Sequence, residues 1–401
     1  MKVVVVGQGY VGLPIAIFAA KAGYEVIGFD LNSKLTDSLN QGISHIGDIS
    51  DQDLVTSISN GSYRATSDPS EFADAEIAVI AVPTPLDEGR KPDLKFLRSA
   101  AEILGINLKK KSLIINESTS FPGTLRNLIA PVVSNLSKLD HLYAISPERV
   151  DPGNKDWTIN NTPRLYAGLT SEASSRTREF YEKFSSNLVE VSSPEVAESA
   201  KLFENTFRQV NIALVNEFAQ IANAIGISAR EVLDAASTKP YGFMKFLPGI
   251  GVGGHCIPVD PAYLAYSAEE HGVVPRFINL ANEVNLGAPS FVIQLIQKRN
   301  IEIKGKKVLV CGIAYKSNIS DVRESPSLDL IVELRILGAE VTWYDPEVSQ
   351  WNDEDTYLPN SDNFDICILA IRHDNMEIEK IVANSKYIFD CTGTIAGVDT
   401  L

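Results

Sequence analysis

The sequence predicts an α/β protein with three regions: an N-terminal domain with a parallel sheet, a central all-helical domain with a long connecting helix, and a smaller C-terminal α/β domain. Three observations support this prediction. Short apolar runs alternate with helical patterns in the first half, helical patterns alone fill the middle, and the alternation resumes beyond Lys304. We expect the boundaries at 1–193, 194–300 and 301–401.

The first half contains six strand-like runs. They read KVVVVG, EVIGFD, EIAVIAVP, SLIINEST, LYAISPE and NLVEVSS. Continuous apolar runs of this length are typical of strands that are buried on both faces of a parallel sheet covered by helices. This half therefore predicts a doubly covered parallel sheet.

The middle begins with an unusually long helical pattern. From about Pro194 to Gly226, apolar residues recur at helical spacing with no internal proline or glycine, which predicts one long helix. Helical patterns continue to about Arg299, interrupted by the glycine-rich segment FLPGIGVGGHCIPVDP.

Four later runs, KKVLVCG, EVTWYDP, FDICILAI and KYIFDC, again predict parallel strands separated by helices. The polar segment from Glu347 to Asn363 is expected to form a loop or a short insertion.

The charge balance excludes several classes of partner. The 401 residues carry a formal net charge of -15, so we expect no binding to nucleic acid or to anionic lipid surfaces. No stretch of eighteen apolar residues predicts a membrane span, and the start of the chain resembles a first strand more than a signal peptide, so we expect a cytoplasmic protein.

Four cysteines are too sparse for a disulfide framework, and we expect reduced thiols. Cys311, Cys367 and Cys391 lie in strand-like runs, where cysteine is usually a small buried hydrophobic residue. Cys256 differs, because it lies in the glycine-rich loop of the helical region.

A glycine motif follows the first strand-like run. Gly7, Gly9 and Gly12 belong to GQGYVG, which lies between a run of four valines and a helical pattern. This context predicts a Rossmann domain whose helix N-terminus receives a pyrophosphate. Tyr10 and Val11 lie within the motif and are expected to contact the cofactor.

Asp30 ends the second strand-like run, EVIGFD. A carboxylate there would accept hydrogen bonds from the adenosine ribose and repel a 2′-phosphate. The sequence therefore predicts NAD as the cofactor and not NADP.

Two threonines follow later strand-like runs. Thr84 lies in AVPTP and Thr119 in NEST, and both are expected at the carboxyl edge of the sheet, where open α/β sheets bind ligands. They would reach the cofactor or a water molecule. Ordinary turn chemistry explains either residue equally well.

The glycine-rich loop places four glycines before His255 and Cys256. Such a backbone can wrap closely around a ligand, and a thiol exposed on it is a candidate nucleophile. The alternative is a shielded structural cysteine. A metal site is not expected, because no second Cys/His pair supplies the remaining ligands.

Lys201 and Asn205 are four residues apart on the predicted long helix and so face the same side. Beside a pocket, a lysine and an amide can polarise an alcohol oxygen and stabilise an oxyanion. Without other evidence, such a pair is more often a solvated helix edge.

Seven motifs together carry a family resemblance. GQGYVG, AVPTP, NEST, SPERVDPG, AESAKLFENTF, PGIGVGGHCIPVDP and KSNISDVRESP occur in order over almost the whole chain. With them the sequence resembles the UDP-glucose/GDP-mannose dehydrogenase family. SPER-x-x-PG together with GGHC is similar to the branch that acts on UDP-N-acetylhexosamines.

The resemblance implies an NAD-dependent oxidation of the sugar C6 hydroxymethyl to a carboxylate, through two hydride transfers. Cys256 would form a thiohemiacetal and then a thioester. UDP-N-acetylglucosamine is the expected substrate, and UDP-N-acetylmannosamine, UDP-N-acetylgalactosamine and UDP-glucose are the alternatives. A role in surface polysaccharide synthesis is implied by the family alone.

The resemblance also assigns roles to residues. Lys201 and Asn205 would stabilise the oxyanion, and Thr119 would help to position the hydrolytic water. Glu148 or Asp260 would be the general base, and this choice stays open. The expected substrate-binding residues are Glu148, Arg149, Lys201, Asn205, Phe246, Leu247, Gly253, His255 and Lys316. Arg323 is expected on the cofactor side.

Two features limit the transfer of roles. Pro152 occupies a position where the UDP-glucose branch has a glutamate, so that part of the family's water network is not expected here. His255 either contacts an N-acetyl group or adjusts the acidity of the thiol, and the sequence leaves both possibilities open.

Two other functions fit the sequence less well. A two-electron hydroxyacid dehydrogenase would need Lys201 and Asn205 but neither the cysteine nor a third domain. A non-catalytic NAD-responsive binding protein would be expected to lack catalytic positions, and none is missing. We also expect a homodimer formed through the central helices, with higher oligomers as an alternative.

Overall fold

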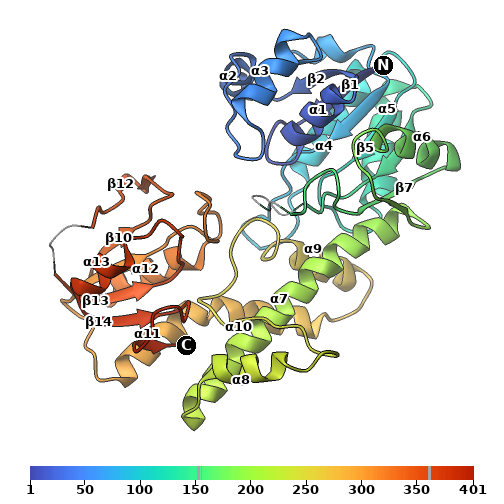
Figure 1. Ribbon diagram of the computed structural model, residues 1–401. Helices are drawn as coiled ribbons and strands as arrows, with labels where there is room; N and C mark the ends of the chain where they lie inside the picture. Colours follow the sequence, from blue (N-terminus) through green and yellow to red (C-terminus); the bar gives the residue numbers. More distant parts are fainter. Residues whose placement is uncertain (151–153, 155, 360–362) are drawn as a thin grey trace. The chain divides into compact units, whose positions relative to one another are not determined.

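The computed structural model describes residues 1–150, 154, 156–359 and 363–401, and its chain divides into two compact units (Figure 1). The N-terminal unit contains Met1–Glu204 and Ala262–His271, and the C-terminal unit contains Asn205–Pro261 and Gly272–Leu401. Within the described residues, no helix has both the length and the apolar character needed to cross a membrane. The three domain boundaries given above remain predictions.

The N-terminal unit is built on an eight-stranded sheet in the order β3-β2-β1-β4-β5-β6-β7-β8. Neighbouring strands are parallel except for β6 and β7, which pair antiparallel. The strands are β1 Lys2–Val6, β2 Glu25–Phe29, β3 Tyr63–Thr66, β4 Ile77–Ile80, β5 Leu113–Asn116, β6 Leu142–Ile145, β7 Arg164–Gly168 and β8 Leu188–Glu190. The strand order reverses between β1 and β4, and open α/β sheets bind ligands at the carboxyl edge of such a reversal.

Helices cover both faces of this sheet (Figure 1). On one face the buried side chains of α1, α3 and α6 pack against the strands, and on the other those of α4 and α5 do so. The elements are α1 Gly12–Lys21, α2 Ser33–Asn40, α3 Asp51–Ser59, η1 Pro69–Phe72, α4 Lys95–Asn107, η2 Leu125–Ile129, α5 Ala130–Ser137 and α6 Ser171–Tyr181. The predicted Rossmann architecture is confirmed.

The C-terminal unit is built on a parallel five-stranded sheet in the order β10-β9-β13-β14-β15. Buried side chains of α11 and α12 pack on one face and those of α13 on the other. The elements are β9 Lys307–Cys311, α12 Pro326–Ile336, β10 Glu340–Tyr344, β13 Phe364–Leu369, α13 Ile378–Ala383, β14 Ser385–Asp390 and β15 Asp399–Thr400. The smaller Rossmann-like domain is thereby confirmed.

The helical middle of the chain contains five helices, α7 Pro194–Ile225, α8 Ala229–Ser237, α9 Asp260–Glu270, α10 Arg276–Leu286 and α11 Ala288–Lys298. The predicted long helix is confirmed as α7, which spans 32 residues and contributes to both units. The segment between α8 and α9 contains the glycine-rich loop and forms no helix or strand.

Three details differ from the expectations or refine them. The sequence reasoning missed β3 and β7, because four or five residues with a charged member show no clear apolar run. The polar segment before β13 contains a two-stranded hairpin, β11 Gln350–Trp351 and β12 Glu354–Asp355. Cys311, Cys367 and Cys391 are buried free thiols, as predicted, whereas Cys256 is exposed.

Candidate functional site

The turn between β1 and α1 contains three glycines, and they differ in the space that the surrounding protein leaves for a Cβ atom. Gly7 has φ +92°, and a Cβ on it would lie 2.3 Å from the carbonyl oxygen of Ala81. A Cβ on Gly12 would lie 1.8 Å from the carbonyl oxygen of Gly7. At Gly9, by contrast, a Cβ would meet no protein atom within 4 Å. Protein packing therefore requires glycine at the first and third positions, and the open side at Gly9 fits the close approach of a ligand.

Asp30 lies directly beside this turn. Its Oδ2 accepts the backbone N–H of Gln8 at 2.9 Å, and its Oδ1 accepts that of Asn32 at 2.9 Å. The N-terminus of α1 has no side-chain cap at Val11 and no acidic residue in its first turn. Backbone N–H groups and a ribose-binding carboxylate are the groups that hold a dinucleotide, so these residues fit NAD. Tyr10, within the turn, is 43% exposed.

Three loops meet at the carboxyl edge of this sheet. Ser118 Oγ accepts the backbone N–H of Val82 at 2.9 Å, which joins the loop of Thr84 to that of Thr119. The backbone N–H of Glu148 donates to the carbonyl oxygen of Glu117 at 3.3 Å, which adds the third loop. Thr84 is buried, while Thr119 and Glu148 are half-buried. The N-terminal unit thus brings three predicted site segments together.

A buried ion pair beneath these loops was missed by the sequence reasoning. Arg164 Nη1 donates to Glu117 Oε1 at 2.5 Å and to Ser146 Oγ at 3.1 Å, and Tyr181 also donates to Glu117. The pair connects the ends of β5 and β6. Glu117 lies in the NEST motif, but Arg164 lies in β7, the strand that the apolar pattern did not reveal.

Two carboxylates near the start of α7 contact the same edge. Glu198 accepts hydrogen bonds from Ser120 Oγ at 3.2 Å and from the backbone N–H groups of Gly123 at 2.6 Å and Leu125 at 3.1 Å. Burial raises the pKa of Glu198 to about 7, although these donors favour its ionised form. The sequence reasoning did not single out this glutamate, which lies inside AESAKLFENTF.

The second carboxylate is Glu204. It accepts two hydrogen bonds from Arg149, at 3.1 Å from Nε and 2.6 Å from Nη2. Arg149 Nη1 also donates to the carbonyl oxygen of Pro163 at 2.6 Å. The predicted substrate residue Arg149 is therefore held against α7, one residue after Glu148.

Lys201 and Asn205 lie one turn apart on α7, as the sequence predicts, and both are less than 10% exposed. Asn205 Nδ2 donates to Asp260 Oδ2 at 2.6 Å, and Asp260 is 1% exposed. The backbone N–H of Asp260 in turn donates to the carbonyl oxygen of Cys256 at 2.8 Å. The C-terminal unit thus places an exposed thiol one turn before a buried carboxylate and amide pair.

The Cys256 loop packs against the loop that contains Lys316 and Arg323. The backbone N–H of Gly254 donates to the carbonyl oxygen of Arg323 at 2.9 Å. A Cβ on Gly253 would lie 2.6 Å from the Cβ of Tyr315, so this glycine is required by close packing. Lys316 is half-buried, and the Arg323 guanidinium pairs with Asp321 at 2.6 Å.

The remaining predicted residues also belong to the C-terminal unit. Burial lowers the pKa of His255, and the nearby Arg323 lowers it further, so both effects favour the neutral imidazole. Phe246 packs edge-on against Phe207, with ring centroids 6.0 Å apart, and Leu247 is 45% exposed.

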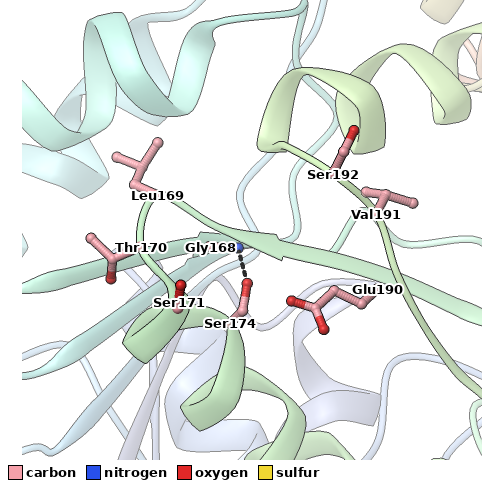
Figure 2. Close-up of a pocket in the computed structure, with 8 residues that line it drawn as sticks. All are labelled: Gly168, Leu169, Thr170, Ser171, Ser174, Glu190, Val191 and Ser192. Atoms are coloured by element: carbon pink, nitrogen blue, oxygen red, sulfur yellow. Dashed lines mark hydrogen bonds between the residues drawn. The ribbon is translucent and has the colours of Figure 1, made fainter.

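Two further observations bear on the location of the site. Figure 2 shows a hollow between the N-terminal end of α6 and residues 190–192, lined by Gly168, Leu169, Thr170, Ser171, Ser174, Glu190, Val191 and Ser192. None of these is a predicted site residue. The N-terminus of α6 is already capped by Thr170, and the Glu190 carboxylate would repel a phosphate. In the described part of the chain, no cluster of three or more His, Cys, Asp or Glu residues could hold a metal ion.

Comparisons with known proteins cover nearly the whole chain. Three models of the UDP-glucose/GDP-mannose dehydrogenase family match it: the NAD binding domain over residues 1–185, the central domain over 195–286 and the UDP binding domain over 309–396. These matches agree with the cofactor fit at Asp30 and Gly9.

Relatives with named substrates match over most of their lengths. The chain is 37% identical to a UDP-N-acetyl-D-glucosamine 6-dehydrogenase of Pseudomonas aeruginosa, covering 95% of this chain and 93% of the relative. It is 37% identical to an NDP-N-acetyl-D-galactosaminuronic acid dehydrogenase of Ralstonia solanacearum, with coverages of 82% and 78%. A solved UDP-D-ManNAc dehydrogenase of Pyrococcus horikoshii superposes with a TM-score of 0.90 at 32% identity, with coverages of 100% and 98%.

Proposed function

The chain belongs to the UDP-glucose/GDP-mannose dehydrogenase family and is an NAD-dependent oxidoreductase, and from this premise we propose that it oxidises C6 of a UDP-N-acetylhexosamine to the carboxylate. UDP-N-acetylglucosamine is the first choice, because a relative that is 37% identical over 95% of this chain carries that specificity in its name. The galacto and manno epimers follow, since relatives named for them match nearly as well. UDP-glucose is the remaining alternative.

The observation that carries the proposal is the position of Cys256. Its thiol is exposed, whereas the other three thiols are buried. It precedes by one turn the buried Asp260, which accepts a hydrogen bond from Asn205. In this proposal Cys256, Asp260 and Asn205 supply a nucleophile, a base and an oxyanion donor. A two-electron dehydrogenase has no use for this thiol.

The reaction removes four electrons and consumes one water. NAD, when bound, accepts a hydride in each of the two oxidations. The Cys256 thiolate adds to the C6 aldehyde to form a thiohemiacetal, whose oxidation leaves a thioester. Water then attacks the thioester, releasing the carboxylate, two protons and the thiolate.

Residues on α7 would stabilise charge during these steps. The Lys201 ammonium and the second N–H of the Asn205 carboxamide would stabilise the negative oxygen of the tetrahedral species, and Lys201 would also serve as the acid and base of the first oxidation. The hydrogen bond to Asp260 fixes the orientation of the Asn205 amide. This fixed orientation suits an oxyanion donor, because it requires no rearrangement during the reaction.

The hydrolytic water requires a base, and two carboxylates compete for the role. Asp260 is buried and hydrogen-bonded to Asn205. Glu148 is half-buried, and its Oε1 accepts the backbone N–H of Val150 at 2.7 Å. Replacing each by its amide separates them: the variant that lacks the base completes both oxidations once and then stalls as the thioester.

For substrate and cofactor binding we assign the residues predicted above. Gly7, Gly9, Tyr10, Val11, Gly12, Asp30, Thr84, Thr119 and Arg323 would contact NAD. Arg149, Phe246, Leu247, Gly253, His255 and Lys316 would contact the sugar nucleotide. The protein is acidic overall, and the half-buried Lys316 would supply the positive charge that the diphosphate of the sugar nucleotide needs.

We also propose a homodimer formed through the central helices. Large apolar side chains on α7 and α10 are exposed: Phe203, Leu214, Ile221, Phe277 and Leu280 are each at least 51% accessible. A monomer is expected to bury such a surface against a second copy. Light scattering that gave the mass of a monomer in dilute solution would contradict this proposal.

The experiment that tests the activity counts the NADH formed per sugar nucleotide consumed. Each N-acetylhexosamine epimer and UDP-glucose is supplied separately to the wild type and to Cys256→Ala. We expect two NADH from an N-acetylated substrate and loss of acid formation in the variant. One NADH per sugar, or turnover that does not depend on Cys256, would favour a two-electron dehydrogenase.

A further inference from the structure

The carboxylate of Glu198 holds one loop at three points. It accepts the Ser120 hydroxyl at 3.2 Å, the Gly123 N–H at 2.6 Å and the Leu125 N–H at 3.1 Å, and the residue is 1% exposed. All three donors lie in the segment that runs from the end of β5 into η2. Thr119 is in the same segment, next to Ser120.

Glu198 also belongs to the helix that contains the proposed oxyanion residues. It precedes Lys201 by three residues on α7, so the two side chains emerge from neighbouring positions on one helix face. Thr119 is therefore connected to Lys201 through its neighbour Ser120, the Glu198 carboxylate and one turn of α7. A shift of the loop would change the position of Thr119 relative to Lys201.

Helix capping alone does not explain this arrangement. Thr124, at the start of η2, does not cap this helix with its side chain, and its hydroxyl instead donates to the carbonyl oxygen of Phe121 at 2.6 Å. Instead, the N–H groups of Gly123 and Leu125 are satisfied by a carboxylate from a different helix, at the cost of burying an acid. Such an acid connects two elements, which a local cap cannot do.

We propose that Glu198 is a positioning residue that holds the Thr119 loop in register with Lys201 and thereby sets the rate of thioester hydrolysis. This inference rests on the proposed function, in which Thr119 helps to position the hydrolytic water. Glu198 itself does not contact the substrate. Its effect is exerted through the loop.

The test uses Glu198→Gln in the full-length enzyme, with the sugar nucleotide that yields two NADH in the wild type. Glutamine keeps the size but presents an NH₂ group to at least one of the loop donors. We expect kcat to fall by about ten-fold or more, since a displacement of about 1 Å can cost about a hundred-fold, while KM for both substrates changes by less than about three-fold. Intact-mass analysis should show Cys256 carrying the substrate less four hydrogens, the mass of the stalled thioester.

The matched control is Glu195→Gln. Glu195 accepts a hydrogen bond from Arg126 Nε at 2.7 Å and so joins the same two elements, η2 and α7, but in an exposed ion pair that does not contact the Thr119 loop. We expect wild-type kinetics and no adduct. Ser120→Ala removes one of the three donors and should give a smaller effect of the same kind, which tests the inference even if Glu198→Gln does not fold.

A double-mutant cycle separates positioning from general destabilisation. If Glu198 acts through Thr119, then Glu198→Gln should reduce kcat far less in a Thr119→Ala background than in the wild type. Equal factors in both backgrounds, or slower turnover without the thioester adduct, would overturn the inference. Failure of the proposed function looks different, because the wild type itself would then give one NADH or none with every sugar nucleotide.

Discussion

The guanidinium of Arg164 lies against the carboxylate of Glu117 at 2.5 Å, and both side chains are at most 4% exposed. The same guanidinium stacks over the ring of Tyr181, 4.5 Å from its centroid, and donates to Ser146. Through these contacts one buried cation connects the strand ends that precede Thr119 and Glu148. Neither partner can be removed without leaving a buried group unsatisfied.

Arg164→Ala should therefore destabilise the N-terminal unit strongly. Removing one partner of a buried pair typically costs about 3–5 kcal/mol, because the other charge stays buried without compensation. Replacing both, in Glu117→Gln with Arg164→Met, should cost much less. Denaturant unfolding followed by circular dichroism measures both. Arg126→Ala, which breaks an exposed pair, is the control and should cost at most about 1 kcal/mol.

The pKa of Glu198, raised by burial from 4.5 to about 7, predicts a pH dependence of stability. Between these values the folded state holds a proton that the unfolded state has lost, so the free energy of unfolding should fall as the pH rises from about 4.5 to about 7. The contribution is about 3 kcal/mol, from about 1.4 kcal/mol per pKa unit. Two charged groups interact electrostatically with Glu198: Glu195 on the same helix, which raises its pKa, and Arg126 on η2.

The free energy of unfolding is measured at pH 5 and at pH 7.5 for the wild type and for Glu198→Gln. The contribution of Glu198 is the change between the two pH values in the wild type minus the same change in the variant. The variant should lose less stability than the wild type over this range, because glutamine does not titrate. Parallel losses in the two proteins would show that Glu198 is ionised at both pH values.

Two glycines of the first turn should respond to alanine in opposite ways. Gly9→Ala should leave stability unchanged, since its Cβ meets no protein atom within 4 Å, but should weaken NAD binding by about ten-fold or more as the methyl group occupies the space of the pyrophosphate. Gly12→Ala should destabilise the fold, because its Cβ would lie 1.8 Å from a carbonyl oxygen. Thermal unfolding and NAD titration distinguish the two. Equal loss of stability in both variants would contradict the assignment of Gly9 to the cofactor.

Asp30 should control the choice of cofactor. Asp30→Ala removes the carboxylate that would accept the ribose hydroxyls and repel a 2′-phosphate, so KM for NAD should rise by about ten-fold and the discrimination against NADP should shrink. Initial rates with each dinucleotide measure this. Asp37→Asn, at an exposed carboxylate on α2, should change neither value. Discrimination retained in Asp30→Ala would assign cofactor choice to another residue.

Much of the fold could be predicted because its signals are local. The buried strands are continuous apolar runs, and α7 has a helical period over 32 residues without an internal glycine. The glycine turn and the exposure of Cys256 could also be predicted, since both depend on short segments with unusual composition.

The supports of the site could not be predicted in this way. Arg164 is itself the charged residue of the five-residue strand β7, and its partner Glu117 is 47 positions away in the sequence. Glu198 contacts donors 73 to 78 positions earlier. Such pairings depend on which strands and helices become neighbours, and periodicity does not encode that.

The distribution of thiols has a practical consequence for work on this molecule. Sγ of Cys311 and Sγ of Cys367 are 3.8 Å apart inside the C-terminal sheet, Cys391 is buried nearby, and Cys256 alone of the four is exposed. A soluble thiol reagent should therefore label the native chain once, at the proposed nucleophile. That single label offers a titration of active enzyme and a site for a spectroscopic probe without any mutation.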